Sequence, residues 1–195
     1  KGFFPNGLTL QFPTASGDKG AFFDASLFQF VESGAIAPVS MTGNPNFTCQ
    51  AVVRTDGVGT FYAPFLHWGA PASGQSVYFS IFRDTPDRVY AGFYNGGLRA
   101  VSNLPPGSFH HIIWVRDSNG GTEGVHSGFR VWIDGVEIAL EPDPTLGNPA
   151  VAVTNTTFRV NRATDGVRFF RGVVDEIVLY DRALTDEEVL DLNIA

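Results

Sequence analysis

Short segments in which apolar and polar residues alternate recur along the whole chain. Residues 47–54 place Phe, Cys, Ala and Val on one side and Thr, Gln, Val and Arg on the other, which is typical of a half-buried strand. Residues 76–83 and 88–94 repeat the pattern, and the turn residues between them predict a β-hairpin. In 129–140, Asp134-Gly135 separates two apolar runs and predicts a second hairpin, since a primed two-residue turn needs positive φ.

The remaining apolar runs predict further strands, separated by irregular connections. Residues 61–69 are predicted to be a strand despite Pro64, which indicates an edge or bulged position. We expect surface loops over 34–46 and 141–155, which are rich in proline and polar residues. The other expected strands span 8–12, 21–31 (one strand or two short ones), 110–116, 156–160 and 173–180.

A strand followed by a short helix is predicted at the C-terminal end. Thr185 lies three residues before Glu188, the spacing of a capping box in which each side chain accepts the other residue's backbone N–H. The acidic residues 186–188 would occupy the first turn, where the helix dipole favours negative charge. The helix should therefore begin at Thr185 and dock on the body through its apolar side chains.

The residues of this C-terminal segment also carry a family resemblance. Residues 172–192 read Gly-Val-Val-Asp-Glu-Ile-Val-Leu-Tyr-Asp-Arg-Ala-Leu-Thr-Asp-Glu-Glu-Val-Leu-Asp-Leu, which resembles the closing signature of the laminin G-like, concanavalin A-like lectin-glucanase jelly-roll family. Residues 108–117 and 129–135 are similar to the family's central Trp-His-His strand and its later Tyr-Val-Asp-Gly hairpin. Here Phe109 stands where Trp is usual, and Trp132 where Tyr is usual.

Many short strands with a single terminal helix predict an all-β fold, a two-sheet antiparallel β-sandwich with one short C-terminal helix. The length of 195 residues suits one domain over residues 1–195. The resemblance implies that this sandwich is a concanavalin A-like jelly roll and that the protein is extracellular.

Charge and composition narrow the range of partners. The net charge of −7 argues against nucleic acid, polyanions and anionic membranes, and no apolar run approaches the length of a membrane span. The single cysteine, Cys49, allows no internal disulfide. The chain begins at Lys1 without a leader segment, which predicts a processed or excised fragment, so other domains of a larger parent protein are candidate partners.

A catalytic site is not predicted. Glycan-cleaving jelly rolls that resemble this chain carry alternating carboxylates along one strand, so that acid and nucleophile project from one face. Here Asp175 and Glu176 are adjacent and would point to opposite faces, as would His110 and His111. The sequence also lacks a nucleophile elbow, a phosphate loop and paired-cysteine spacings.

The resemblance implies one candidate cofactor, a calcium ion. Laminin G-like jelly rolls often hold one Ca²⁺, which needs oxygen ligands from separated segments. Asp18 and Asp175 are the candidate ligands, because the first and last strands are commonly neighbours in this fold. In the alternative, Asp175 is a buried carboxylate that accepts backbone N–H groups and Asp18 is a solvated loop charge.

The strand periodicity predicts a group of outward-facing aromatic and polar residues. If Val77, Phe79 and their equivalents on the other strands pack between the sheets, one outer face should carry the alternate residues. Aromatic rings there could stack on sugars while polar groups donate hydrogen bonds. Alternatively, loops cover the rings and form a second small core. The candidate carbohydrate-binding residues are Tyr78, Tyr90, Tyr94, Trp132, Arg130, Arg88, His110 and Gln50.

The leading hypothesis is a non-catalytic extracellular recognition module that binds a glycan or a glycosylated surface. One alternative is a structural or adhesive module that binds protein through the same aromatic residues. The other is a cryptic glycan lyase or hydrolase. Fold alone does not choose among them, because this architecture carries many functions.

Overall fold

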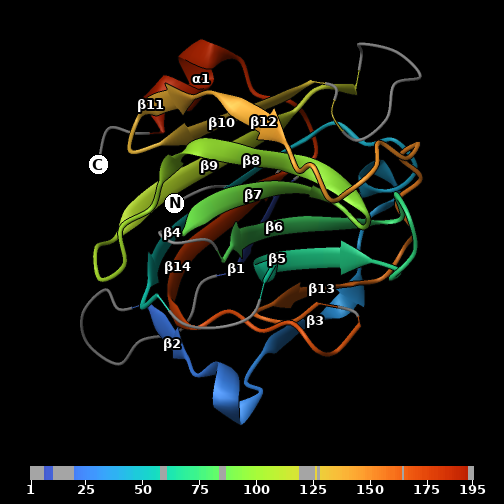
Figure 1. Ribbon diagram of the computed structural model, residues 1–195. Helices are drawn as coiled ribbons and strands as arrows, with labels where there is room; N and C mark the ends of the chain where they lie inside the picture. The colour runs from blue at the N-terminus through green and yellow to red at the C-terminus, as the bar shows by residue number, and fades with distance from the viewer. Residues whose placement is uncertain are drawn as a thin grey trace.

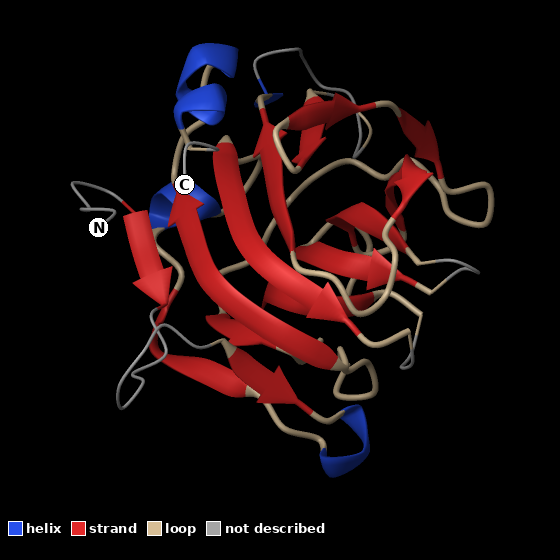
Figure 2. Ribbon diagram, turned by 90° about the vertical axis from the view of Figure 1, so that its left-hand side faces the viewer, coloured by secondary structure: helices blue, strands red, loops and turns tan. Residues whose placement is uncertain are grey.

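Two antiparallel β-sheets pack face to face in the computed structural model (Figures 1 and 2). The structure describes residues 7–10, 20–57, 61–83, 87–118, 126, 128–163 and 165–192. Sheet I is formed by β1 (Gly7–Leu10), β2 (Ala21–Phe23), β4 (Phe47–Thr55), β9 (His110–Arg116), β10 (Phe129–Ile133), β11 (Val136–Ile138) and β14 (Gly172–Tyr180). Sheet II is formed by β3 (Val31–Ile36), β5 (Ala63–Gly69), β6 (Ser76–Phe82), β7 (Arg88–Phe93), β8 (Gly96–Asn103), β12 (Leu140–Pro142) and β13 (Thr157–Val160).

The strand order confirms the predicted two-sheet antiparallel sandwich. Sheet I runs β1-β14-β4-β9-β10-β11, with β2 also paired to β14, and sheet II runs β12-β8-β7-β6-β5-β13-β3. Two short 3-10 helices, Ala25–Leu27 and Val39–Met41, lie in connections, and α1 (Asp186–Asp191) follows β14 at the upper end of the molecule in both views (Figures 1 and 2). No helix in the described ranges is long and apolar enough to span a membrane.

An aromatic core holds the two sheets together. Trp114 of β9 is fully buried, and its ring centroid lies 4.8 Å from that of Phe47 in the same sheet and 5.8 Å from that of Phe79 in the opposite sheet. The alternate residues of β4, β6 and β7 point into this core, as the periodicity predicts. Trp68 and Cys49 are also fully buried there and belong to the same core as Trp114.

Three local features differ from the sequence-based expectations. Residues 96–103, for which no strand was predicted, form β8, whose opening Gly96-Gly97 has the composition of a turn. β3 continues to Ile36, into the predicted loop that begins at residue 34. The bulge expected near Pro64 is present between Pro64 and Leu66, but β5 is an interior strand, paired with β6 and β13, and not an edge strand.

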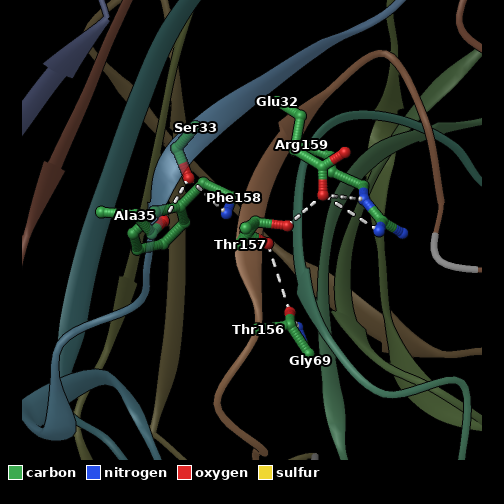
Figure 3. A network of polar contacts seen from close by, with 8 residues as sticks. All are labelled: Glu32, Ser33, Ala35, Gly69, Thr156, Thr157, Phe158 and Arg159. Atoms are coloured by element: carbon green, nitrogen blue, oxygen red, sulfur yellow. Dashed lines mark hydrogen bonds and ion pairs between the residues drawn. The ribbon is translucent and has the colours of Figure 1, made fainter.

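Side-chain contacts fasten the edge strand β3 to β13 (Figure 3). The Ser33 hydroxyl donates to the Ala35 carbonyl (2.6 Å) and accepts from the backbone N–H of Phe158 (3.0 Å). The Glu32 carboxylate accepts from the Arg159 guanidinium at 3.1 Å and from the Thr157 hydroxyl. These contacts span the β-bulge between Thr157 and Arg159, where the backbone register shifts.

The predicted capping box starts α1. The Glu188 N–H donates to the Thr185 hydroxyl (3.3 Å), and the Thr185 N–H donates to the Glu188 carboxylate (2.9 Å). The hydrogen bond from Arg182, and after it the one from the Thr185 N–H, lower the pKa of Glu188 to about 2. This lowered pKa stabilises the folded state above the ordinary value of 4.5, and the contribution is lost as the pH falls through about 2.

We predict that Thr185→Ala lowers the free energy of unfolding by about 1 kcal/mol, because the N–H of Glu188 loses its acceptor. Urea denaturation at neutral pH measures the difference. Thr185→Ser retains the hydroxyl and should recover most of the stability. An equal loss in both variants would show that the capping hydrogen bond is not responsible.

Candidate functional site

The structure divides the predicted carbohydrate-binding residues between the two outer faces of the sandwich. Tyr78, Tyr90 and Arg88 project from sheet II, and Tyr94 follows directly after β7. Gln50, His110, Arg130 and Trp132 belong to strands of sheet I. The prediction of one shared outer face is therefore wrong. Alternation along a strand determines which side chains leave the core, but not which sheet the strand joins.

Trp132 is a buried residue beneath the terminal helix. Its side chain is 3% exposed and packs with Ile113, Leu184 and Val189 in a second apolar cluster on sheet I. Arg130 stacks over the Trp132 ring at 5.2 Å and donates to the Leu184 carbonyl at 3.0 Å, and it also pairs with Asp186 of α1. These two side chains hold α1 on the sheet, and the Trp132 ring presents no open face to a glycan.

The two other predicted carbohydrate-binding residues that lie on sheet I are also separated from the tyrosines. His110 Nδ1 lies 2.7 Å from Asp134 Oδ2, a contact to the turn between β10 and β11. Gln50 is partly buried on β4, opposite Ile113. Neither residue belongs to the group of tyrosines on sheet II.

A hollow of about 290 Å³, which includes space open to solvent, lies over sheet II. We call it the tyrosine hollow, because it brings the three predicted tyrosines together with a fourth. It is lined by Tyr62, Tyr78, Tyr90, Phe93, Tyr94, Asn95, Leu146 and Arg168. Tyr78 and Tyr90 are covered as the alternative prediction supposed, because they are 3% and 1% exposed and form a small apolar cluster with Ala163. Tyr62 and Tyr94 stay half-buried.

Two facing glycines make room for the floor of the tyrosine hollow. Gly92 of β7 is paired with Gly97 of β8. A Cβ atom on Gly97 would lie 2.4 Å from the Tyr90 hydroxyl oxygen, and one on Gly92 would lie 2.7 Å from it. Because neither glycine has a side chain, the Tyr90 ring can lie across both strands. Its hydroxyl makes a long contact (3.4 Å) to the Phe93 carbonyl.

Tyr62 forms a wall of the tyrosine hollow in a strained backbone conformation. Its φ of 53° is unusual for an aromatic residue. The ring packs edge-on against Tyr90 (4.9 Å between centroids), and the hydroxyl donates to the Asp143 carboxylate at 2.7 Å. Burial opposes ionisation of Asp143, but hydrogen bonds from Thr145 and Tyr62 outweigh it and lower the pKa of the carboxyl. Residues held in such sparsely populated conformations cluster at functional sites.

Arg168 supplies the cationic group of the tyrosine hollow. It is paired with Asp165, and its guanidinium lies 5.8 Å from the centroid of the Tyr62 ring. Beneath it, His67 is fully buried and packs edge-on against Tyr78 at 4.4 Å. Burial, and then the charges of Arg159 and Arg168, lower the pKa of His67 to about 3, so its imidazole is neutral at physiological pH.

Four lining residues of the tyrosine hollow were missed by the sequence-based prediction. Tyr62, Asn95, Leu146 and Arg168 lie in turns and loops, where no periodicity relates them to a strand face. Arg88 was predicted correctly to face outward from β7, but it pairs with Glu141 at 2.7 Å and does not line the hollow. A positive φ at Tyr62 and the contact between Arg168 and the tyrosines arise only from the tertiary fold.

The structure describes only one of the two predicted calcium ligands, Asp175. β1 and β2 both pair with β14, so the first strands and the last are neighbours as expected. Asp175 lies on β14 at a bulge, where its carboxylate accepts the N–H of Glu176 at 2.9 Å. Asp18 lies outside the described residues. Within the part of the chain that the structure describes, no three His, Cys, Asp or Glu side chains gather to hold a metal.

Comparison with known families identifies the fold. Residues 31–190 match the concanavalin A-like lectin/glucanases superfamily. The chain belongs to this superfamily. The resemblance drawn from residues 172–192 is therefore confirmed. No curated protein sequence matches the chain.

Several solved protein structures share the fold of this chain at low sequence identity. Domain 4 of an extracellular arabinanase from Geobacillus stearothermophilus, in complex with arabinotriose, is 18% identical with a TM-score of 0.57, and the match covers 96% of this chain and 87% of that chain. A carbohydrate-binding module of the Ruminococcus gnavus IT-sialidase, bound to α2,3-sialyllactose, is 12% identical with a TM-score of 0.58, over 95% of this chain and 98% of that chain. The Trypanosoma rangeli sialidase is 19% identical with a TM-score of 0.52, over 78% of this chain but 23% of that enzyme.

We predict that Trp132→Ala lowers the free energy of unfolding by about 3–5 kcal/mol, because it leaves a cavity beneath α1. Urea denaturation measures the loss. Phe109→Ala removes an aromatic ring that is 52% exposed, and it should change stability by about 0.5 kcal/mol or less. Equal, small effects in the two variants would contradict the placement of Trp132 under the helix.

Proposed function

We propose that the protein is a non-catalytic, extracellular carbohydrate-binding module and that the tyrosine hollow is its binding site. The observation that carries the proposal is a hollow in which the half-buried rings of Tyr62 and Tyr94 meet an asparagine amide and an arginine, above the buried Tyr78 and Tyr90. Aromatic rings stack on the apolar faces of sugar rings, and a few polar groups fix orientation. Part of the space in the hollow is open to solvent, so it would contact one side of a sugar residue and not enclose it.

The tyrosine hollow is held in shape by contacts within the protein, which favours binding. Tyr90 rests on the two glycines, and Tyr62 is fastened to the buried Asp143. Pre-formed side chains lose little conformational entropy when a ligand binds. Weak binding by a single copy could be strengthened by tandem copies or by tethering to another domain of a parent protein.

The ligands of the structural neighbours support a glycan partner. The arabinanase domain was solved with arabinotriose and the sialidase module with sialyllactose. Both ligands are oligosaccharides, and both host domains match nearly the whole length of this chain. At identities of 18% and 12% these neighbours share the fold, so the sugar itself must be inferred from the residues of the hollow.

The carboxylates beside the tyrosine hollow support binding without catalysis. Asp143 accepts from Tyr62 and Thr145, and Asp165 is paired with Arg168. The pKa of Asp143 is lowered, the direction opposite to that required of a general acid in glycoside hydrolysis. We therefore expect no product from a polysaccharide panel.

The second candidate function, protein binding, is favoured by a different surface. Leu27, Phe28 and Val167 are each more than 60% exposed, and Phe28 packs on Phe169 at 5.2 Å. Such apolar side chains are common at protein interfaces. Binding of a protein that is lost in Phe28→Ala and retained in Tyr94→Ala would support this function instead.

We predict that Tyr94→Ala and Arg168→Gln each weaken glycan binding about tenfold. The first variant loses a stacking surface, and the second loses a charged hydrogen-bond donor. A glycan array identifies the ligand, and isothermal titration calorimetry with that oligosaccharide measures the affinity. Phe109→Ala is the matched control, because it removes an exposed aromatic ring from another part of the surface.

Unchanged affinity in both hollow variants would contradict the proposed site. Circular dichroism of each variant separates loss of binding from loss of folding. An array on which no glycan binds would overturn the proposed function as a whole.

We also propose that Ca²⁺ binds at the β2–β14 region, through Asp175 and Asp18. Gly20, two residues after Asp18, lies against Asp175, since a Cβ on Gly20 would be 3.1 Å from the Asp175 Cβ. Because β14 belongs to sheet I, the ion would support the fold without contacting the tyrosine hollow.

We predict that adding Ca²⁺ to chelator-treated protein raises Tm and leaves glycan affinity unchanged. Differential scanning fluorimetry measures the first quantity, and calorimetry measures the second. Asp175→Asn should abolish the rise in Tm. A Tm that does not respond to Ca²⁺ would contradict the calcium site without bearing on the hollow.

A further inference from the structure

We infer that the tyrosine hollow selects uncharged sugars and discriminates against sugars that carry a carboxylate. This inference rests on the proposed function and adds to it the chemical class of the ligand. It follows from the arrangement of charges on the outer face of sheet II. An acidic sugar is held most strongly by an arginine whose guanidinium is free to form a bidentate pair with the sugar carboxylate.

The only arginine that lines the hollow in the described part of the chain already has such a partner. Arg168 is paired with Asp165, three residues away in the same loop. The two side chains are 30% and 16% exposed, so solvent screens the pair incompletely. A sugar carboxylate would either displace Asp165, which leaves that carboxylate partly buried without its cation, or share the guanidinium with Asp165, which brings two negative charges together.

Three other arginines on this face are also matched by carboxylates. Arg88 and Arg99 lie 2.7 and 3.7 Å from Glu141, and Arg159 lies 3.1 Å from Glu32 (Figure 3). Arg88 and Arg99 share Glu141, but the charge of Arg99 also acts on Asp143 and lowers its pKa, so Asp143 is the third carboxylate. These six groups together carry no net positive charge that would attract an anion toward the hollow. The formal net charge of −7 for the whole chain acts in the same direction.

The two titratable groups directly behind the walls of the hollow add no positive charge. Asp143 is buried directly behind Tyr62, and its lowered pKa keeps it ionised at neutral pH, where it balances the charge of Arg99. His67, below Tyr78, carries no charge at that pH, because burial lowers its pKa to about 3. An anionic sugar would therefore meet one cation, Arg168, that is already paired with the carboxylate of Asp165, and like charges disfavour binding there.

The same groups suit the hydroxyls of an uncharged sugar. Arg168 offers several N–H donors, and the carboxylate of Asp165 offers acceptors beside them. Asn95, at the rim, has an amide that can donate and accept. Sugar hydroxyls also donate and accept, so they can bind the Arg168–Asp165 pair without breaking it. The tyrosine rings then contact the apolar ring face.

The test compares matched neutral and acidic glycans on the wild-type protein. Suitable pairs are lactose with α2,3-sialyllactose and galactobiose with digalacturonate, together with the acidic derivative of any further neutral oligosaccharide that binds on an array. We expect the neutral member of each bound pair to bind at least about tenfold more tightly, by calorimetry. Affinity for it should change little with salt concentration, because no net charge is neutralised.

Tighter binding of the acidic member by the wild-type protein would overturn the inference while leaving the proposed function intact. Binding of no glycan at all would overturn the proposed function and this inference with it. The variant Asp165→Asn tests the cause directly. It removes the carboxylate partner of Arg168, so affinity for the acidic member should rise about tenfold or more and become sensitive to salt.

A folded Asp165→Asn protein that still prefers the neutral sugar to the same degree would overturn the assigned role of the Arg168–Asp165 pair. If that variant does not fold, as circular dichroism would show, the wild-type comparison of matched glycans still decides the inference. Phe109→Ala, which lies outside the hollow, should retain the wild-type preference.

Discussion

The aromatic packing around Trp114 is the contact on which the rest of the structure depends. Its ring meets Phe47 and Phe129 of sheet I and Phe79 and Phe93 of sheet II, at centroid distances between 4.8 and 6.2 Å. Strand side chains alternate, so burial of Phe79 and Phe93 forces Tyr78 onto the outer face. A register slip of one residue would exchange the core with the tyrosine hollow. The tyrosine hollow is therefore a consequence of how the core is packed.

The same alternation has different results on the two outer faces, because different segments cover them. On sheet I, α1 covers Trp132 and Ile113 and turns them into a second apolar cluster. On sheet II, Tyr78 and Tyr90 are buried, while the loops that carry Leu146 and Arg168 leave Tyr62 and Tyr94 half-buried. Outward aromatic residues thus stabilise the fold on one face and line a hollow on the other. Trp132 and Tyr94 look equivalent by periodicity and differ only in what lies above them.

Local patterns predicted the features that depend on a few neighbouring residues. The capping box at Thr185, the turn at Asp134-Gly135 and the inward positions of β4 all follow from sequence spacing. Sheet membership could not be predicted in this way, because it depends on pairings between strands far apart in the chain, such as β14 with β4. β8 was missed because its glycines suggest a turn, whereas the structure uses Gly97 to make room for the Tyr90 ring.

The walls of the tyrosine hollow show why its chemistry is harder to predict than its floor. The floor comes from strand positions, and its two buried tyrosines were among the predicted residues. The walls come from Tyr62, Leu146 and Arg168, which the loops bring together from three distant parts of the sequence. The selectivity that we propose for the hollow depends on these walls, since Asp143 and Asp165 help to balance the charges there. Under that proposal, loop substitutions change the preferred sugar while the packing around Trp114, and with it the sandwich, stays the same.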